Sequence, residues 1–221
     1  MTGIDLPPAT DGQGRPGGPR GPGRAQARTE QPGPDQPDLD RPDLDRSDLD
    51  QPDLDRSGSD EARTDAFRAA MARLPAGVAV LAARWRGTDH AMTASAVASV
   101  SLDPPMLLFC VHGDARLREA LDDVDTWAVS VLGDDQAAVA DWLSSPGRPA
   151  VGQLDRVPHR RAPRSGAAWI EGAAAWVECR TEQIVAAGDH DVVLGRVLES
   201  HEGDAGLGGL VHLRRRTRGV R

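Results

Sequence analysis

Between Gly77 and Leu213 the chain consists of short apolar segments separated by turn residues, and this pattern constrains the fold more than any other feature. Such segments are typical of β-strands, and few helical stretches lie between them as crossovers. The pattern predicts a mainly β protein, an antiparallel barrel rather than a doubly wound sheet. The expected strands are 77–85, 91–102 (with or without a bend), 106–112, 126–132, 167–185 (one long strand or a hairpin), 190–200 and 208–213, which is the last.

Three short helices are expected around this barrel, at residues 65–74, 115–121 and 134–143. In the first, Phe67, Ala70, Met71 and Leu74 follow the spacing of one helical face, and Thr64 is the predicted N-cap. The polar segment 144–165 is rich in proline and arginine and is expected to be a loop.

The first sixty residues differ in composition from the rest of the chain. They hold 13 acidic and 7 basic residues, and so carry −6 of the net charge of −8, and proline and glycine crowd them. From Gln36 the pentads QPDLD, RPDLD, RSDLD and QPDLD follow one another. A repeat of five suits neither a helical nor a strand face, and one leucine per pentad buries little surface. We therefore expect residues 1–60 to be a disordered tail, solvated or partner-binding, and residues 61–221 to be the folded domain.

Several classes of function are disfavoured. The nearly neutral body argues against nucleic-acid binding, and no apolar run is long enough to span a membrane. Two cysteines and the lack of a secretory signal indicate a reducing, cytoplasmic setting. The six histidines lack the spacing of a metal site, so no metal is expected. Nucleotide-binding loops of the GxGxxG and GxxxxGK[ST] types and the GxSxG elbow are absent from the sequence.

The segment 92–101 is unusual for a core strand because small and hydroxylated side chains alternate in it. Thr93, Ser95, Ser99 and Ser101 all fall at odd positions, so strand periodicity places them on one face. Two interpretations stay open at this point. The hydroxyl groups and backbone could bind a flat ligand with polar ring substituents or a phosphate, or the strand could present a hydroxyl-rich surface to solvent.

Four segments in order carry a resemblance to a known family: FRAAMARLPAGVAVLAA, MTASAVASVSLDPPMLLFCV, TWAVSVL and GDHDVVLGRV. They resemble the NAD(P)H-dependent flavin reductases with the FMN-binding split-barrel fold, the reductase components of two-component flavin monooxygenases. The resemblance runs from about Phe67 to Leu213. It implies a six-stranded Greek-key barrel with short peripheral helices, usually a homodimer, with flavin in a groove near the subunit interface.

The resemblance also implies a set of site residues. The flavin would lie along the strand that contains the hydroxyl groups and against the strand after the proline pair. His190, in the Gly188-Asp189-His190 motif, would face the nicotinamide side of the flavin as the catalytic residue; alternatively, this motif is only a turn before a strand. The implied cofactor-binding residues are Thr93, Ala94, Ser95, Ala96, Val97, Ser99, Val100, Ser101, Cys110, Val111, His112, Ala115 and Arg116.

The turn after this second strand departs from the family pattern. Many relatives place serine and threonine there to bind the flavin phosphate, whereas this chain has Gly113-Asp114-Ala115-Arg116. Arg116 is a forked cationic donor that suits a phosphate, at the start of a short helix. Asp114 would repel a phosphate unless it points away or caps that helix. A second open question concerns the arginines at 160, 161 and 164, which would meet the nicotinamide phosphates or be solvated.

The expected function is therefore hydride transfer from NAD(P)H to FMN, or alternatively FAD or riboflavin, with reduced flavin supplied to a partner monooxygenase. The main alternative is a non-catalytic flavin-binding or redox carrier protein on the same split barrel. A third interpretation gives the tail the main role, as a tether to the oxygenase. The choice between FMN and FAD, the choice between NADH and NADPH, and whether flavin stays bound are left open at this point.

Overall fold

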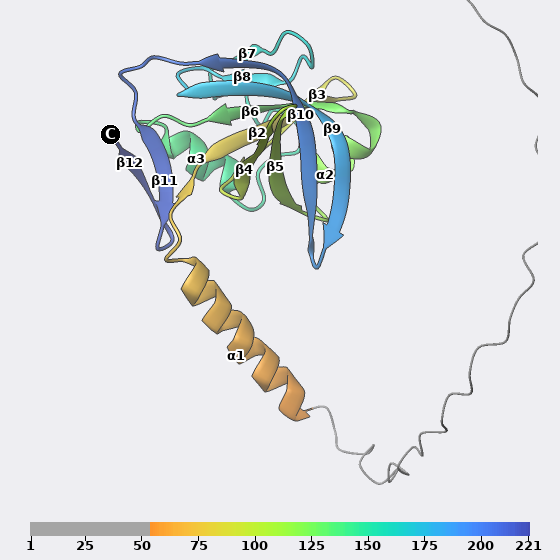
Figure 1. Cartoon of the computed structure of the whole chain (residues 1–221), viewed down its shortest axis with the longest axis vertical. Coiled ribbons are helices and arrows are strands. Elements are labelled where there is room, and N and C mark those ends of the chain that lie inside the picture. Colours follow the sequence, from red (N-terminus) through yellow and green to blue (C-terminus); the bar gives the residue numbers. More distant parts are fainter. Residues whose placement is uncertain (1–53) are drawn as a thin grey trace, which may run out of the picture. The chain divides into compact units, whose positions relative to one another are not determined.

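The computed structural model describes residues 54–221, with side chains from Gly58 onward, and the pentad repeats before Leu54 lie outside the described residues. Strands account for most of the regular secondary structure of the described residues (Figure 1). Helix α1 spans Leu54–Met71, α2 spans Arg116–Asp123 and α3 spans Ala137–Ser144. Within the described part, no helix is both long and apolar enough to cross a membrane.

The strands form one large sheet and two small ones. The seven-stranded sheet has the order β3 (Thr88–Ala94), β2 (Ala79–Trp85), β6 (Thr126–Val131), β9 (Ala175–Ala187), β10 (His190–Glu202), β5 (Pro105–His112) and β4 (Val97–Leu102). A second sheet joins β1 (Ala76–Gly77), β11 (Gly209–Leu213) and β12 (Arg216–Val220). Strands β7 (His159–Arg161) and β8 (Ala168–Ile170) form the third. All the pairings are antiparallel, as predicted.

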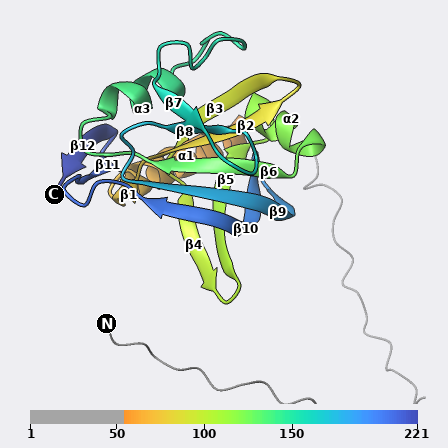
Figure 2. The same ribbon diagram turned by 90° about the horizontal axis from the view of Figure 1, so that it is seen from above.

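The large sheet must curl into a barrel because its two edge strands are consecutive in the chain. Strands β3 and β4 lie at opposite edges of the sheet, yet only Ser95 and Ala96 separate them. Two residues cannot span the width of a flat seven-stranded sheet. The bent strand expected at 91–102 is therefore confirmed, and its two halves occupy the two edges. Figure 2 shows the β4–β5 hairpin extending beyond the other strands.

Strand β2 is buried on both faces, and it separates two hydrophobic clusters. Leu81 faces the first cluster, with Phe109 of β5, Trp127 of β6 and buried leucines of α2. The alternate residue Val80 faces the second cluster, with α3, the loop after it, the β7–β8 hairpin and β11. Strands covered on both faces read as continuous apolar runs, which explains the sequence AVLAA in this strand.

Four expectations about secondary structure are wrong. The segment 167–185 is neither one long strand nor a hairpin, because β8 pairs with β7 whereas β9 lies between β6 and β10 in the large sheet. Thr64 is not an N-cap, because α1 begins at Leu54 and Thr64 lies inside it; ion pairs of Arg63 with Asp60 and of Arg68 with Asp65 support the helix. The segment 144–165 is not all loop, since β7 occupies part of it. The segment 208–213 is not the last strand, because the chain turns at Arg214 and Arg215, both with positive φ, and continues as β12.

Candidate functional site

The bend between β3 and β4 lies beside strand β5. Ala94 is buried at the end of β3, whereas Ser95 and Ala96 are exposed in the bend. The backbone N–H of Cys110 donates to the carbonyl oxygen of Ala96 at 3.0 Å, which attaches the bend to β5. Closure of the barrel therefore brings the bend against the second predicted flavin segment. The small side chains there leave the backbone accessible to a flat ligand.

The four hydroxyl groups do not share one face. Thr93 and Ser95 line a cavity of about 550 Å³ beside α3 and β12, and Thr93 Oγ1 donates to the carbonyl oxygen of Ala140 at 2.8 Å. Ser99 and Ser101 line a different cavity, of about 330 Å³, under the β4–β5 hairpin. Strict alternation fails because the bend interrupts the strand and the β4–β5 register shifts between Ser99 and Ser101.

The three predicted flavin residues at the end of β5 differ in how far they are buried. Val111 is completely buried in the first cluster, so only its backbone could meet a cofactor. Cys110 is half-buried, and His112 is exposed. His112 lies directly opposite His190 on β10, and the two imidazole rings meet edge to face with their centroids 5.3 Å apart. Residues nearly eighty positions apart in the chain thus form one cross-strand histidine pair.

A tight turn positions His190. Gly188 has a φ of 70°, which the two-residue connection between β9 and β10 requires. His190 Nδ1 lies 2.7 Å from Asp189 Oδ1, and this hydrogen bond together with the charge of His190 lowers the pKa of Asp189. With Nδ1 engaged by the carboxylate, Nε2 is the ring nitrogen available to a ligand. The Asp189 carbonyl also accepts the Gly113 N–H at 3.0 Å, which ties the turn to β5.

The turn after β5 directs Asp114 into solvent. Its side chain is almost fully exposed, and its backbone N–H donates to His112 Nδ1 at 3.1 Å. Ala115, and not Asp114, is the N-cap of α2, and no side chain caps this helix end. Arg116 begins the helix and lines a cavity of about 310 Å³. Of the two arrangements that sequence reasoning left for Asp114, the structure has the one that points away.

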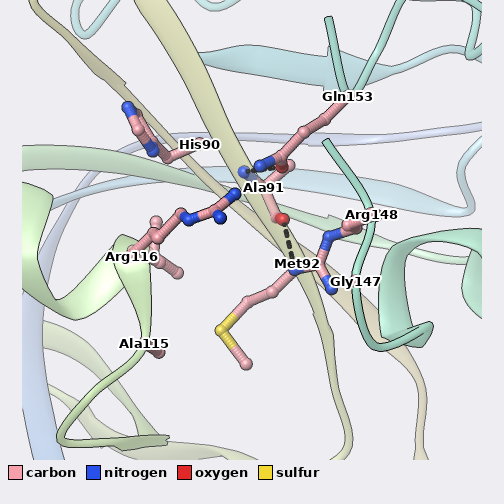
Figure 3. A pocket seen from close by; sticks show the side chains of 9 residues that line it. His90, Ala91, Met92, Ala115, Arg116, Gly147, Arg148 and Gln153 are labelled. Carbon is pink, nitrogen blue, oxygen red and sulfur yellow. Dashed lines mark hydrogen bonds between the residues drawn. The ribbon is translucent and has the colours of Figure 1, made fainter. Parts of the chain in front are cut away.

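That cavity also contains residues that sequence reasoning missed (Figure 3). Buried Gln153 accepts the Ala91 N–H at 3.1 Å, and Arg148 donates to the Ala91 carbonyl at 3.0 Å. Because β3 is an edge strand, these side chains satisfy backbone groups that no neighbouring strand reaches. His90 completes the cavity from β3. The long loop after α3 carries Arg148 and Gln153, and nothing in its local pattern indicates that it folds back onto β3.

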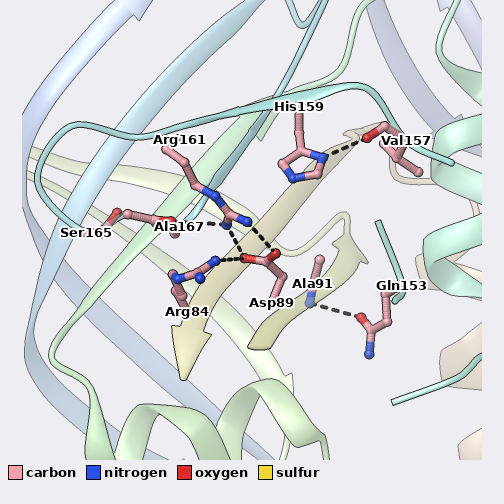
Figure 4. A network of polar contacts seen from close by, with 10 residues as sticks. Arg84, Asp89, Ala91, Gln153, Val157, His159, Arg161, Ser165 and Ala167 are labelled. Carbon is pink, nitrogen blue, oxygen red and sulfur yellow. Dashed lines mark hydrogen bonds and ion pairs between the residues drawn. The ribbon is translucent and has the colours of Figure 1, made fainter. Parts of the chain in front are cut away.

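The three loop arginines are engaged within the protein. Arg161 forms a two-pronged ion pair with Asp89, which also pairs with Arg84 at 3.6 Å (Figure 4). The Arg160 guanidinium lies over the rings of Trp169 and Trp176, at 4.8 and 4.7 Å from their centroids. Arg164 Nε lies 3.3 Å from Glu199 Oε2. These contacts favour a structural role for the three side chains.

The sequence of this chain is similar to one protein family and to several characterised reductases. A family described as "Flavin reductase like domain" matches residues 71–221. An NADH-dependent FMN reductase of Streptomyces nodosus subsp. asukaensis is 38% identical over 148 residues, which cover 67% of this chain and 80% of that protein. The reductase component of 4-hydroxyphenylacetate 3-monooxygenase from Thermus thermophilus is 35% identical, over 64% of this chain and 87% of that protein.

Solved structures show the same similarity. The flavin reductase component of a bacterial two-component tryptophan halogenase superposes with a TM-score of 0.67 at 37% identity, over 71% of this chain and 98% of that one. The NADH:FAD oxidoreductase of Streptomyces globisporus, in complex with NAD and FAD fragments, gives a TM-score of 0.67 at 31% identity, over 73% of this chain and 94% of that one.

Proposed function

This chain belongs to the flavin reductase family, and from that premise we propose that it transfers hydride from a nicotinamide cofactor to a flavin. The main observation in support of this proposal is that three segments that are distant in the sequence lie next to one another at one end of the barrel. The bend at Ser95 and Ala96 adjoins Cys110, and His112 adjoins His190. These are the segments that the family resemblance assigns to flavin and nicotinamide.

The residues present fit a flavin. The bend offers small side chains and exposed backbone beside β5, and the cationic cavity at Arg116 adjoins the same strand end. Flavin and nicotinamide supply the hydride chemistry when bound, so the protein has to hold and orient them. Ser95, Ala96 and the backbone of Cys110 and Val111 would form the flavin surface. We propose FMN or FAD as the flavin and NADH as the reductant, because the relatives include an NADH-dependent FMN reductase and an NADH-dependent FAD reductase.

The test is steady-state oxidation of NADH and of NADPH by the purified full chain, with FMN, FAD or riboflavin in excess over enzyme. Multiple turnovers with a preference for one flavin and for NADH are expected. Flavin binding without turnover would instead support the alternative of a carrier protein. Reduced flavin would then pass to a monooxygenase, as the relatives' reductase-component names indicate. Adding reduced flavin from this enzyme to a flavin-dependent oxygenase, and measuring product formation, tests that transfer.

Replacing His190 with asparagine should lower kcat/KM for NADH about fivefold and leave the Kd for flavin unchanged. An imidazole packed against a ring contributes roughly 1 kcal/mol, and about 1.4 kcal/mol corresponds to a factor of ten. His201→Asn is the matched control, since His201 lies on the same strand, is equally exposed and also pairs with a carboxylate, Glu199. Equal losses in the two variants, or a loss of flavin affinity in His190→Asn, would contradict a nicotinamide-side role.

We propose that the protein is a homodimer in solution. Apolar side chains are exposed at three places: Phe67 (65%) and Met71 on α1, Val100 and Leu102 (87%) on β4, and Val131 on β6. The last two places border the valine-rich cavity under the β4–β5 hairpin. Exposed apolar side chains beside such a cavity are typical of a protein interface. Sedimentation equilibrium should give twice the 23.5 kDa chain mass, and a monomer at micromolar concentration would contradict the proposal.

The proposed location is the cytoplasm. Cys110 and Cys179 are both free thiols, and NADH is a cytoplasmic reductant. For residues 1–60 we keep the proposal of a solvated tail ahead of the reductase domain at 61–221. Deleting residues 1–53, which precede α1, should leave NADH oxidation intact if the domain carries the activity, whereas loss of coupling to an oxygenase would favour the tether.

A further inference from the structure

The hairpin of β11 and β12 carries positive charge that the folded domain leaves largely unpaired. Residues 205–221 hold five arginines and no acidic residue, although the whole chain has a net charge of −8. Arg221 pairs with Asp134 at 2.8 Å. The other four are exposed and form no ion pair with a carboxylate of residues 58–221: Arg214, Arg215, Arg216 and Arg218.

The chain that follows α1 adds a fifth arginine to the same side of the protein. The backbone N–H of Arg214 donates to the carbonyl oxygen of Ala72 at 2.7 Å, which holds the turn of the hairpin beside the end of α1 (Figure 1). The next residue, Arg73, lines a cavity of about 440 Å³ together with Arg214 and Arg218, and no acidic side chain of the described residues contributes to this lining. We call Arg73 and the four unpaired hairpin arginines the basic face.

The hairpin turn holds two of these arginines in an unfavourable backbone conformation. Arg214 and Arg215 have φ values of 52° and 60°, in the left-handed region that favours glycine and asparagine. Arg86 also has a positive φ, of 50°, but its guanidinium pairs with Asp123 at 3.1 Å and lies over the ring of Trp85. The side chains of Arg214 and Arg215 have no such partner among the described residues. Because strained positions concentrate where a side chain has a function, the two arginines indicate a partner outside the chain.

The composition of this side of the protein favours another protein as the partner. Phe67 and Met71 on α1 and Leu74 after it are exposed apolar side chains next to Arg73 in the chain. Arginine and exposed apolar side chains together are typical of protein interfaces, whereas nucleic-acid-binding domains are usually basic as a whole. A second copy of this chain fits poorly, since a two-fold contact would oppose the same positive charges. The complementary surface is therefore an acidic one on a different protein.

The basic face also borders the proposed flavin surface. Arg215 and Arg216 line the cavity of about 550 Å³ that contains Thr93 and Ser95, with Asp141 of α3 as the acidic residue on its wall. Ser95 belongs to the bend that we propose lies against the flavin. A protein that covers the basic face would therefore lie at the edge of the flavin surface, where it could receive reduced flavin over a short distance.

We propose that the basic face is the docking surface for the monooxygenase that accepts reduced flavin, and that the oxygenase contacts it through an acidic surface. The identity of the partner rests on the proposed function, whereas the acidic character of its surface rests on the arginines. Carboxylates of the partner would form charge-assisted hydrogen bonds with the exposed guanidinium groups. The contact should weaken as ionic strength rises from about 50 to 200 mM, because these charges are exposed to solvent.

The experiment measures binding of a short fluorescein-labelled polyglutamate peptide to the full chain by fluorescence anisotropy. The peptide represents the acidic surface of the oxygenase. In the double variant Arg214→Asn, Arg215→Asn, the Kd for the peptide should rise about tenfold, since two charged contacts are lost. Its stability in urea should be no lower than that of the wild type, because asparagine adopts positive φ more readily than arginine. Arg86→Asn is the matched control, because it makes the same change at another positive-φ turn and should not alter the Kd.

Steady-state NADH oxidation by the double variant should equal that of the wild type. A fall in kcat/KM for NADH would assign the arginines to nicotinamide phosphate and overturn the proposal. An unchanged Kd for the peptide, an equal loss in Arg86→Asn, or equal affinity for single-stranded DNA of the same length would also overturn it. Tighter peptide binding after deletion of residues 1–53 would replace the oxygenase by the chain's own acidic pentads as the occupant.

Arg73→Gln is a second variant in case the double variant does not fold, because Arg73 lies outside the hairpin turn. It should raise the Kd for the peptide by about threefold, since it removes one exposed charge. Salt-dependent peptide binding by a wild-type chain that does not oxidise NADH would support the acidic docking surface and refute the proposed reductase activity.

Discussion

Glu178→Ala is expected to destabilise the protein by about 2–4 kcal/mol, because the wild-type carboxylate is completely buried and accepts several hydrogen bonds. Its Oε1 receives the Ser165 N–H at 2.8 Å and the Ser165 hydroxyl at 2.6 Å, and the Arg164 N–H lies 3.2 Å away. Alanine would leave these donors without an acceptor inside the protein. Removing one member of a buried polar network lowers stability by more than the intact network adds to it, because the remaining members stay buried without partners.

Urea denaturation measures this loss, and Glu178→Gln is the matched variant. Glutamine keeps an acceptor oxygen at the position of Oε1, so it should retain most of the wild-type stability. The donors come from the segment that connects β7 to β8, so early proteolysis within residues 158–167 should accompany the loss in Glu178→Ala. A loss below about 1 kcal/mol in Glu178→Ala would show that water replaces the carboxylate in this connection.

The strands that the sequence predicts well are those whose whole length is apolar or interrupted only by a bend. Strand β5 is a nearly continuous apolar run between a proline pair and a Gly-Asp turn, and 91–102 shows its bend through its small residues. The end of the fold was harder to predict. Arg214 and Arg215 both adopt positive φ, a conformation that the sequence signals only when glycine or asparagine occupies the turn.

The candidate site likewise contains some residues that the sequence predicts and others that it does not. Strand order and turns bring together the bend, the end of β5 and His190, the segments that the resemblance assigns to one site. The resemblance could not indicate His90, Arg148 or Gln153, because a loop of irregular structure brings the last two to β3. The bond between Gln153 and the Ala91 backbone joins residues 62 positions apart. Such contacts depend on which loop covers an edge strand, and the local periodicity of a sequence does not predict that loop.

Gly195→Ala is the second change with a large expected effect, at about 1–3 kcal/mol of lost stability. A Cβ at this position would overlap Cζ2 of Trp127 and would lie 3.0 Å from Cβ of Cys179, closer than atoms can pack. Trp127 cannot move away easily. Its ring meets Phe109 edge to face with centroids 4.8 Å apart, and its Nε1 donates to Thr181 Oγ1 at 3.0 Å. The loss of stability in Gly195→Ala therefore comes from overpacking in a rigid part of the barrel core.

Gly209→Ala is the matched control for this substitution, because a Cβ there meets nothing within 4 Å and its φ is not positive. Chemical denaturation should show a change within about 0.5 kcal/mol for Gly209→Ala and the larger loss for Gly195→Ala. Phe109 precedes Cys110 on β5, so a displaced Trp127 would also shift the strand that we propose lies against flavin. Gly195→Ala should accordingly weaken the binding of FMN and of riboflavin together. Stability equal to that of Gly209→Ala would mean that the core around Trp127 can expand, and the flavin strand would then be less rigidly supported than its packing implies.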